Sequence, residues 1–183
     1  MRSLIALSLA LAACEATPEE TDLIDAVDPA MDELAADELA PPPVANACGD
    51  MTAYLRNQAD TTALVLEIPG VVAAANAAGG TIRQHITLPD RRVTGELRTG
   101  QRVTAATCTG VIVPPGPAIR RTMTLSGGTI DLVATPVSGP PGMPPAARVD
   151  ITLTDPAFTS PGAGTGYAGT FTWPRVIGGG YYP

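Results

Sequence analysis

Apolar and polar residues alternate with a period of two over most of the chain from residue 47 to the end. In residues 81–88, Ile82, Ile86 and Leu88 fall on one side of an extended chain, and the residues between them are mostly polar. This period is typical of half-buried β-strands. Strands are therefore predicted at residues 63–68, 81–88, 93–98, 103–113, 119–125, 129–135, 149–154 and 167–173.

Glycine and proline separate these stretches. Ser126-Gly127-Gly128 predicts a hairpin between residues 119–125 and 129–135, and residues 136–145, with five prolines and two glycines, predict a loop. The apolar run Val71 to Ala78 predicts one or two helical turns. Seven or eight short strands with frequent turns indicate an all-β fold, a single antiparallel β-sandwich or a partly open barrel over residues 47–183.

Charge divides the chain into three parts, although its net charge is only −7. Residues 15–46 hold ten acids and no base, whereas residues 47–183 hold eight acids and ten arginines, about +2. We predict that residues 14–46 form a flexible acidic tether. The alternative is a segment that folds on a basic partner, with Met31, Leu34 and Leu39 on one helical face. The chain lacks the basic excess of a nucleic-acid-binding protein.

The first residues have the form of a signal peptide. Met1-Arg2-Ser3 is a positive start, and residues 4–13 are apolar apart from Ser8, a run too short to span a bilayer as a helix. Leu11-Ala12-Ala13-Cys14 then resembles the lipobox of bacterial lipoproteins. The alternative is an ordinary secretory signal that contains a cysteine.

The lipoprotein resemblance implies cleavage before Cys14, so that residues 1–13 are the signal peptide. It also implies a diacylglycerol on the Cys14 sulfur and a fatty acid such as palmitate on the new amino group, and several acyl chains give lasting attachment. The mature protein is then expected on a membrane of the bacterial cell envelope. Because Glu15, and not aspartate, follows Cys14, the resemblance favours the outer membrane over the inner one.

With Cys14 assigned to the lipid, Cys48 and Cys108 are the remaining pair. An even number of cysteines in an oxidising compartment predicts a disulfide. A closed loop of this length is expected to stabilise the fold by roughly 4 kcal/mol. We expect the bond to join the start of the domain to a central strand.

Residues for catalysis or for holding a metal are few. His85 is the sole histidine, and no metal site or cofactor is expected. Residues 164–169 spell GxGxxG, but a strand follows them where a dinucleotide site needs a helix. Asp131, Asp150 and Asp155 are candidates for paired carboxylates of the kind that cleave glycosides.

Aromatic residues are concentrated in the last part of the chain, where they could stack on a sugar or anchor a protein partner. Trp173, Tyr181 and Tyr182 are the candidate ligand-binding residues, although alternation also favours a core position for Trp173. The pairs Arg91-Arg92 and Arg120-Arg121 could hold phosphate or carboxylate groups.

These features predict a membrane-anchored envelope lipoprotein with a non-catalytic β-sandwich module that binds an envelope protein or glycan or has a structural role. The alternative is an envelope hydrolase that acts on a glycan through its aspartates. The sequence specifies neither the ligand nor the oligomeric state.

Overall fold

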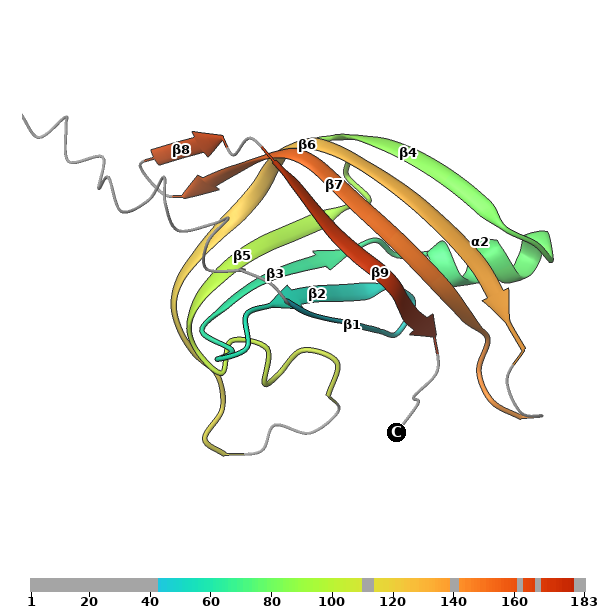
Figure 1. Cartoon of the computed structure of the whole chain (residues 1–183), viewed down its shortest axis with the longest axis horizontal. Helices are drawn as coiled ribbons and strands as arrows, with labels where there is room; N and C mark the ends of the chain where they lie inside the picture. Colours follow the sequence, from blue (N-terminus) through green and yellow to red (C-terminus); the bar gives the residue numbers. More distant parts are fainter. Residues whose placement is uncertain (1–42, 110–113, 139–141, 161–162, 167–168, 180–183) are drawn as a thin grey trace, which may run out of the picture.

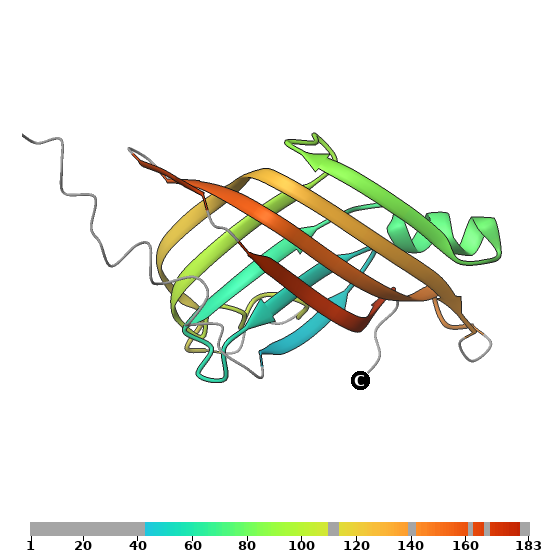
Figure 2. The same ribbon diagram turned by 45° about the horizontal axis from the view of Figure 1, so that its top comes forward.

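The computed structural model describes residues 43–109, 114–138, 142–160, 163–166 and 169–179. These residues form one antiparallel β-sheet that curls into a nearly closed barrel, with a short helix at one end (Figures 1 and 2). The partly open barrel is therefore the form that the predicted all-β fold takes. The elements are β1 (Val44–Cys48), β2 (Thr52–Arg56), β3 (Thr62–Glu67), α2 (Val71–Ala78), β4 (Ile82–Leu88), β5 (Thr94–Gln101), β6 (Ala118–Val137), β7 (Ala146–Ser160), β8 (Ala163–Gly166) and β9 (Thr170–Gly179).

Neighbouring strands follow the path β1-β2-β3-β5-β6-β7, and β9 pairs with the other edge of β7. The long strand β6 pairs along one edge with two partners in turn, β5 at its beginning and β4 further along. β8 extends the sheet beside the last residues of β7. The strand β1 begins at Val44, so the domain starts slightly before the boundary predicted at residue 47.

The predicted hairpin at Ser126-Gly127-Gly128 is wrong, because β6 runs through these residues as one strand. The pairing with β7 shifts register around Gly127, which marks a bulge. Gly128 has a φ of +112°, and a Cβ there would lie 2.8 Å from the carbonyl oxygen of Thr154. The glycines therefore bend a continuous strand without reversing it.

The predicted strand at residues 103–113 is also wrong for its described part, residues 103–109, which form turns. Thr104 donates from its backbone N–H and its hydroxyl to Asp60 Oδ1, at 3.1 and 2.9 Å, and Val103 is fully buried. Arg98, the register partner of Ala63 on β3, donates to the Thr107 hydroxyl. This loop thus covers the outer face of β3, which explains why that strand is buried on both faces.

The Cys48–Cys108 disulfide is present, with the two Cα atoms 5.4 Å apart. Cys108 lies in the loop after β5 and not on a central strand, so the bond joins this loop to the end of β1. The predicted pairing is confirmed, while the predicted position of Cys108 is corrected.

The core fills the inside of the barrel with the alternate residues of every long strand. Leu64 lies opposite Leu55 and Leu97, and Trp173 lies opposite Ile151. The helix α2 closes one end of the barrel and buries Val71, Val72 and Ala75. This helix confirms the expectation of one or two turns at residues 71–78.

Candidate functional site

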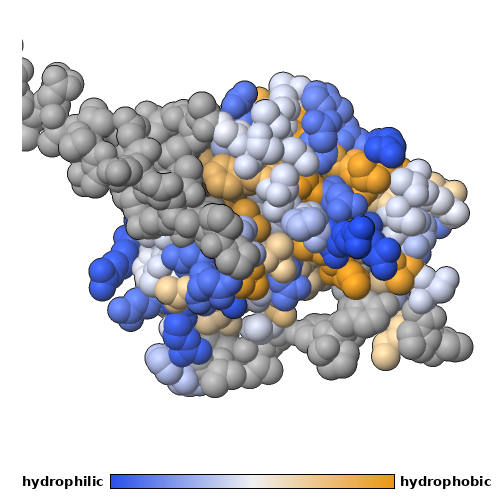
Figure 3. Space-filling model, in the orientation of Figure 1, coloured by the Kyte–Doolittle hydropathy of each residue, from blue (hydrophilic) through white to orange (hydrophobic). Residues whose placement is uncertain are grey.

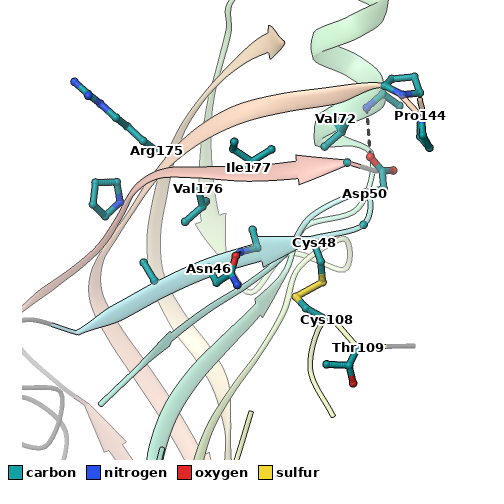
Figure 4. Close-up of a pocket in the computed structure, with 17 residues that line it drawn as sticks. Asn46, Cys48, Asp50, Val72, Cys108, Thr109, Pro144, Arg175, Val176 and Ile177 are labelled. Carbon is teal, nitrogen blue, oxygen red and sulfur yellow. Dashed lines mark hydrogen bonds between the residues drawn. A yellow bond between two sulfur atoms is a disulfide. The ribbon is translucent and has the colours of Figure 1, made fainter. Parts of the chain in front are cut away.

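The sheet leaves an open seam between β1 and β9. Every neighbouring pair along β1-β2-β3-β5-β6-β7-β9 is antiparallel, so the odd number of strands on this path makes β1 and β9 run in the same direction. Among the described residues, one antiparallel bridge joins the turn that follows β1 to the end of β9, and there the Gly179 N–H donates to the Gly49 carbonyl. From that bridge the two strands diverge (Figures 2 and 4).

A pocket of about 1040 Å³ lies along this seam. Most of its lining side chains are small and apolar, and they come from both strands and from the loops at the bridged end (Figure 4). In Figure 3 apolar surface is visible near the end of β9, beside hydrophilic groups. The lining consists of Ala45, Asn46, Ala47, Cys48, Gly49, Asp50, Val72, Ala73, Cys108, Thr109, Pro144, Pro145, Pro174, Arg175, Val176, Ile177 and Gly179.

The open edge of β1 carries backbone groups that point into the seam. Successive residues of an antiparallel strand direct their N–H and C=O groups to opposite edges. The Gly49 carbonyl faces β9, so the backbone groups of Ala45 and Ala47 also face away from β2. The Ala47 N–H donates to the side-chain Oδ1 of Asn46 at 2.8 Å, a local bond in the place where a neighbouring strand would accept.

Asp50 shapes the bridged end of the pocket. Its carboxylate accepts the backbone N–H groups of Gly70 at 2.7 Å and Ala73 at 3.3 Å, at the start of α2. Gly70 has no side chain that could cap the helix, and a carboxylate is favourable at a helix N-terminus. Asp50 therefore couples the β1–β2 turn to the helix that closes the barrel.

Trp173, a predicted ligand-binding residue, is not on the surface. Its side chain has 0% exposure and belongs to the core, so it is not available to a ligand on the outside. The other two predicted binding residues, Tyr181 and Tyr182, lie outside the described residues, as does Cys14. Cys48 and Cys108 both line the seam pocket, next to residues that carried no sequence signal, such as Asn46.

The candidate catalytic groups lie on the outer face of the sheet and do not line the pocket. His85 Nδ1 and Asp131 Oδ1 are 2.7 Å apart across β4 and β6, and both side chains are mostly exposed, at 63% and 60%. Asp150 lies on the neighbouring strand β7, and its Oδ1 accepts the backbone N–H of Arg175 at 2.9 Å. Asp155 Oδ1 accepts the N–H of Gly169. The carboxylates of Asp150 and Asp155 thus each accept a backbone N–H at a bend of the sheet.

The four arginines of the two pairs differ in their exposure and in whether they pair with a carboxylate. The guanidinium of Arg92 donates to both carboxylate oxygens of Asp90, at 3.1 and 2.7 Å, in the turn after β4. Arg91 and Arg120 are exposed, and Arg121 is half-buried and has an interaction of its own. The Arg91-Arg92 pair therefore does not present two unengaged guanidinium groups.

The hydrogen bonds from the Arg92 side chain and backbone, the largest causes, lower the pKa of Asp90 from 3.8 to about 2. We expect Arg92→Gln to raise this pKa toward 3.8, and Arg91→Gln, which removes a weaker Coulombic effect, to change it much less. Because the folded-state pKa is lowered, the stabilisation is present above the ordinary value and is lost as the pH falls toward 2. Carbon-detected NMR titration of the Asp90 carboxyl tests this, and an unchanged pKa in Arg92→Gln would contradict it.

Within the described residues, no cluster of three or more His, Cys, Asp or Glu side chains could hold a metal ion. The same part of the chain contains no helix with the length and apolar character needed to cross a bilayer. No protein-family model matches the chain, and no curated protein or solved structure is significantly similar to it.

Proposed function

We propose that this protein is a lipoprotein of the bacterial cell envelope whose barrel is a non-catalytic binding or structural module. The lipobox-like sequence Leu11-Ala12-Ala13-Cys14 supports the anchor, and the acidic segment that follows supports a tether between membrane and domain. The Cys48–Cys108 disulfide is consistent with an oxidising compartment. The outer membrane is the proposed location.

The seam pocket is the observation that favours a binding role. It is large enough for a ligand or a peptide, and its lining combines small apolar side chains with a few polar groups, the usual composition of binding sites. The hydrolase alternative requires carboxylates that converge in a cleft. Asp131 and Asp150 lie on an exposed sheet face instead, so the binding role is the better supported proposal.

The anchor is tested by Cys14→Ser in cells fed a radioactive fatty acid. We expect complete loss of label on the protein and its release from the membrane fraction, because the attachment atom is gone. The matched control is Cys48→Ser with Cys108→Ser, which removes the other two cysteines and should keep the label. Label that persists on Cys14→Ser would show that the lipoprotein proposal is wrong.

A further inference from the structure

One end of the barrel is built from three segments that contain no charged residue. They are residues 68–82 with the helix α2, residues 132–147 from β6 through the following loop to β7, and residues 176–179 at the end of β9. Figures 1 and 2 show the described residues of these segments at the same end of the barrel. Asn76 Nδ2 donates to the Ala146 carbonyl at 3.2 Å, and a Cβ on Gly178 would lie 2.9 Å from Val72 Cγ2. We call this surface the uncharged end.

The uncharged end exposes large apolar side chains. Three such side chains are exposed among the described residues, and two of them, Met143 at 54% and Ile177 at 40%, lie here. The third, Ile119, lies at the opposite end, where β6 begins. Other exposed residues of the uncharged end include Ala73, Ala77, Ala78, Pro144 and Pro145. Exposed apolar surface of this kind is typical of a site that contacts another surface.

Two arginines border this apolar surface. Arg175 precedes Ile177 by two residues on β9, and Arg148 on β7 is the register partner of Ile177. Both arginines are exposed, and neither guanidinium group has an ion-pair partner among the described residues. A guanidinium group is suited to bidentate hydrogen bonding with a phosphate. Ile177 therefore lies beside two cations that are available to an anionic partner.

The carboxylates at the same border already accept hydrogen bonds from the domain. Those of Asp50 accept the N–H groups at the start of α2, and Asp150 Oδ1 accepts the backbone N–H of Arg175. Glu67 Oε2 accepts the hydroxyl of Thr94 at 3.1 Å. The border thus offers unengaged donors from its arginines, whereas its carboxylates have internal partners. This arrangement is complementary to anionic groups outside the protein.

We propose that the uncharged end docks on the surface of an anionic phospholipid bilayer. Met143 and Ile177 enter the interfacial region, and Arg148 and Arg175 pair with lipid phosphates. Apolar side chains beside cations are the usual combination in proteins that bind this region of a membrane. The choice of a bilayer over a protein partner rests on the proposed anchor at Cys14, which would hold the domain beside a membrane at a high effective concentration.

The length of the chain permits this orientation. β1 runs toward the uncharged end, because Asp50 in the turn after it contacts the start of α2, so Val44 lies on the side away from that end. The 20 residues of β6, the longest strand, span about 66 Å. Residues 15–43 could extend to about 100 Å. A lipid at Cys14 therefore allows the uncharged end to face the membrane.

The apolar contact is tested by flotation with lipid vesicles. The chain from residue 14 with Cys14→Ser lacks the lipid, so any binding comes from the protein itself. We expect it to float with vesicles of two parts phosphatidylcholine to one part phosphatidylglycerol. Met143→Ser combined with Ile177→Ser should weaken this binding at least roughly tenfold, because two apolar side chains no longer leave water. The matched control is Ile119→Ser, which changes a side chain of 42% exposure at the opposite end and should leave binding unchanged.

A second set of variants tests the cations. Arg148→Gln combined with Arg175→Gln should weaken binding to the same vesicles roughly tenfold and remove most of the difference from vesicles of phosphatidylcholine alone. Arg91→Gln combined with Arg120→Gln removes the same charge from exposed positions outside the uncharged end and should have a much smaller effect. Thermal unfolding followed by circular dichroism verifies that each variant is folded.

The outcomes separate the docking surface from the anchor. Absence of vesicle binding, or an equal loss in Ile119→Ser and in the Met143/Ile177 double variant, overturns the proposal. A chain that does not float but forms a dimer in analytical ultracentrifugation, lost in the same double variant, would overturn it in favour of a second copy of the chain. Fatty-acid labelling of Cys14 is a separate measurement, so the docking surface and the anchor can fail independently.

Discussion

Trp173→Ala should lower the free energy of unfolding by about 3–5 kcal/mol, the usual cost of removing a large aromatic side chain from a core. Trp173 is fully buried on β9 and lies opposite Ile151, in the half of the sheet that borders the seam. Alanine would leave a cavity that the paired strands β7 and β9 cannot easily close, because their backbones are held by the ladder. Denaturant unfolding followed by circular dichroism measures the loss.

Two variants serve as controls for this prediction. Ile177→Ala removes an apolar side chain from the same strand, but one that is 40% exposed, and should cost much less than Trp173→Ala. Trp173→Phe should cost less than Trp173→Ala, because it keeps a ring in the core and removes an Nε1–H that has no hydrogen-bond partner among the described residues. Equal costs for Trp173→Ala and Ile177→Ala would contradict the core role of the indole.

Replacing Cys48 and Cys108 together by serine should destabilise the fold by about 4 kcal/mol in the chain-entropy description, with measured values often lower. The bond closes a separation of 60 residues in sequence and holds the loop after β5 against the end of β1. In its absence we also expect faster protease cleavage within residues 103–109, because this loop loses its covalent attachment to β1. Denaturant midpoints and limited proteolysis provide the two measurements.

Reduction offers an independent comparison for the disulfide. Dithiothreitol should shift the unfolding midpoint of the unchanged protein toward that of the double variant and should leave the double variant itself unaffected. A double variant as stable as the unchanged protein would show that the buried contacts of Val103 and Thr104 hold the loop without the bond.

Much of the candidate site could not be predicted from the sequence. The pairing of Cys48 with Cys108 follows from the number of cysteines, and the alternation in residues 81–88 places Ile86 inside. No sequence pattern indicated Asn46 or Asp50 as site residues. Asn46 lies within the predicted tether, and Asp50 lies in a turn. They line a pocket because the two ends of the sheet meet there, and residues 44–48 and 174–179 are far apart in the chain.

The glycines of β6 show why local patterns were insufficient. Gly127-Gly128 is as typical of a hairpin as of a bulge, and the choice depends on the partner strand. Here β7 continues past the glycines on one side, while on the other side β4 ends opposite Gly128 and β5 takes over along the same edge. The chain therefore bends without reversing at this position.

By itself, the sequence determined the all-β class, the period of two that separates core from surface, the short helix at residues 71–78 and the disulfide pairing, because these depend on local spacing and on counts of residues. The tertiary structure alone decided that the loop at residues 103–109 covers β3, that the sheet curls into a nearly closed barrel, and that its two end strands run in the same direction. These properties depend on the order and direction of strands that are distant in sequence. They are also the reason why β1 and β9 meet at a single bridge among the described residues and form no ladder.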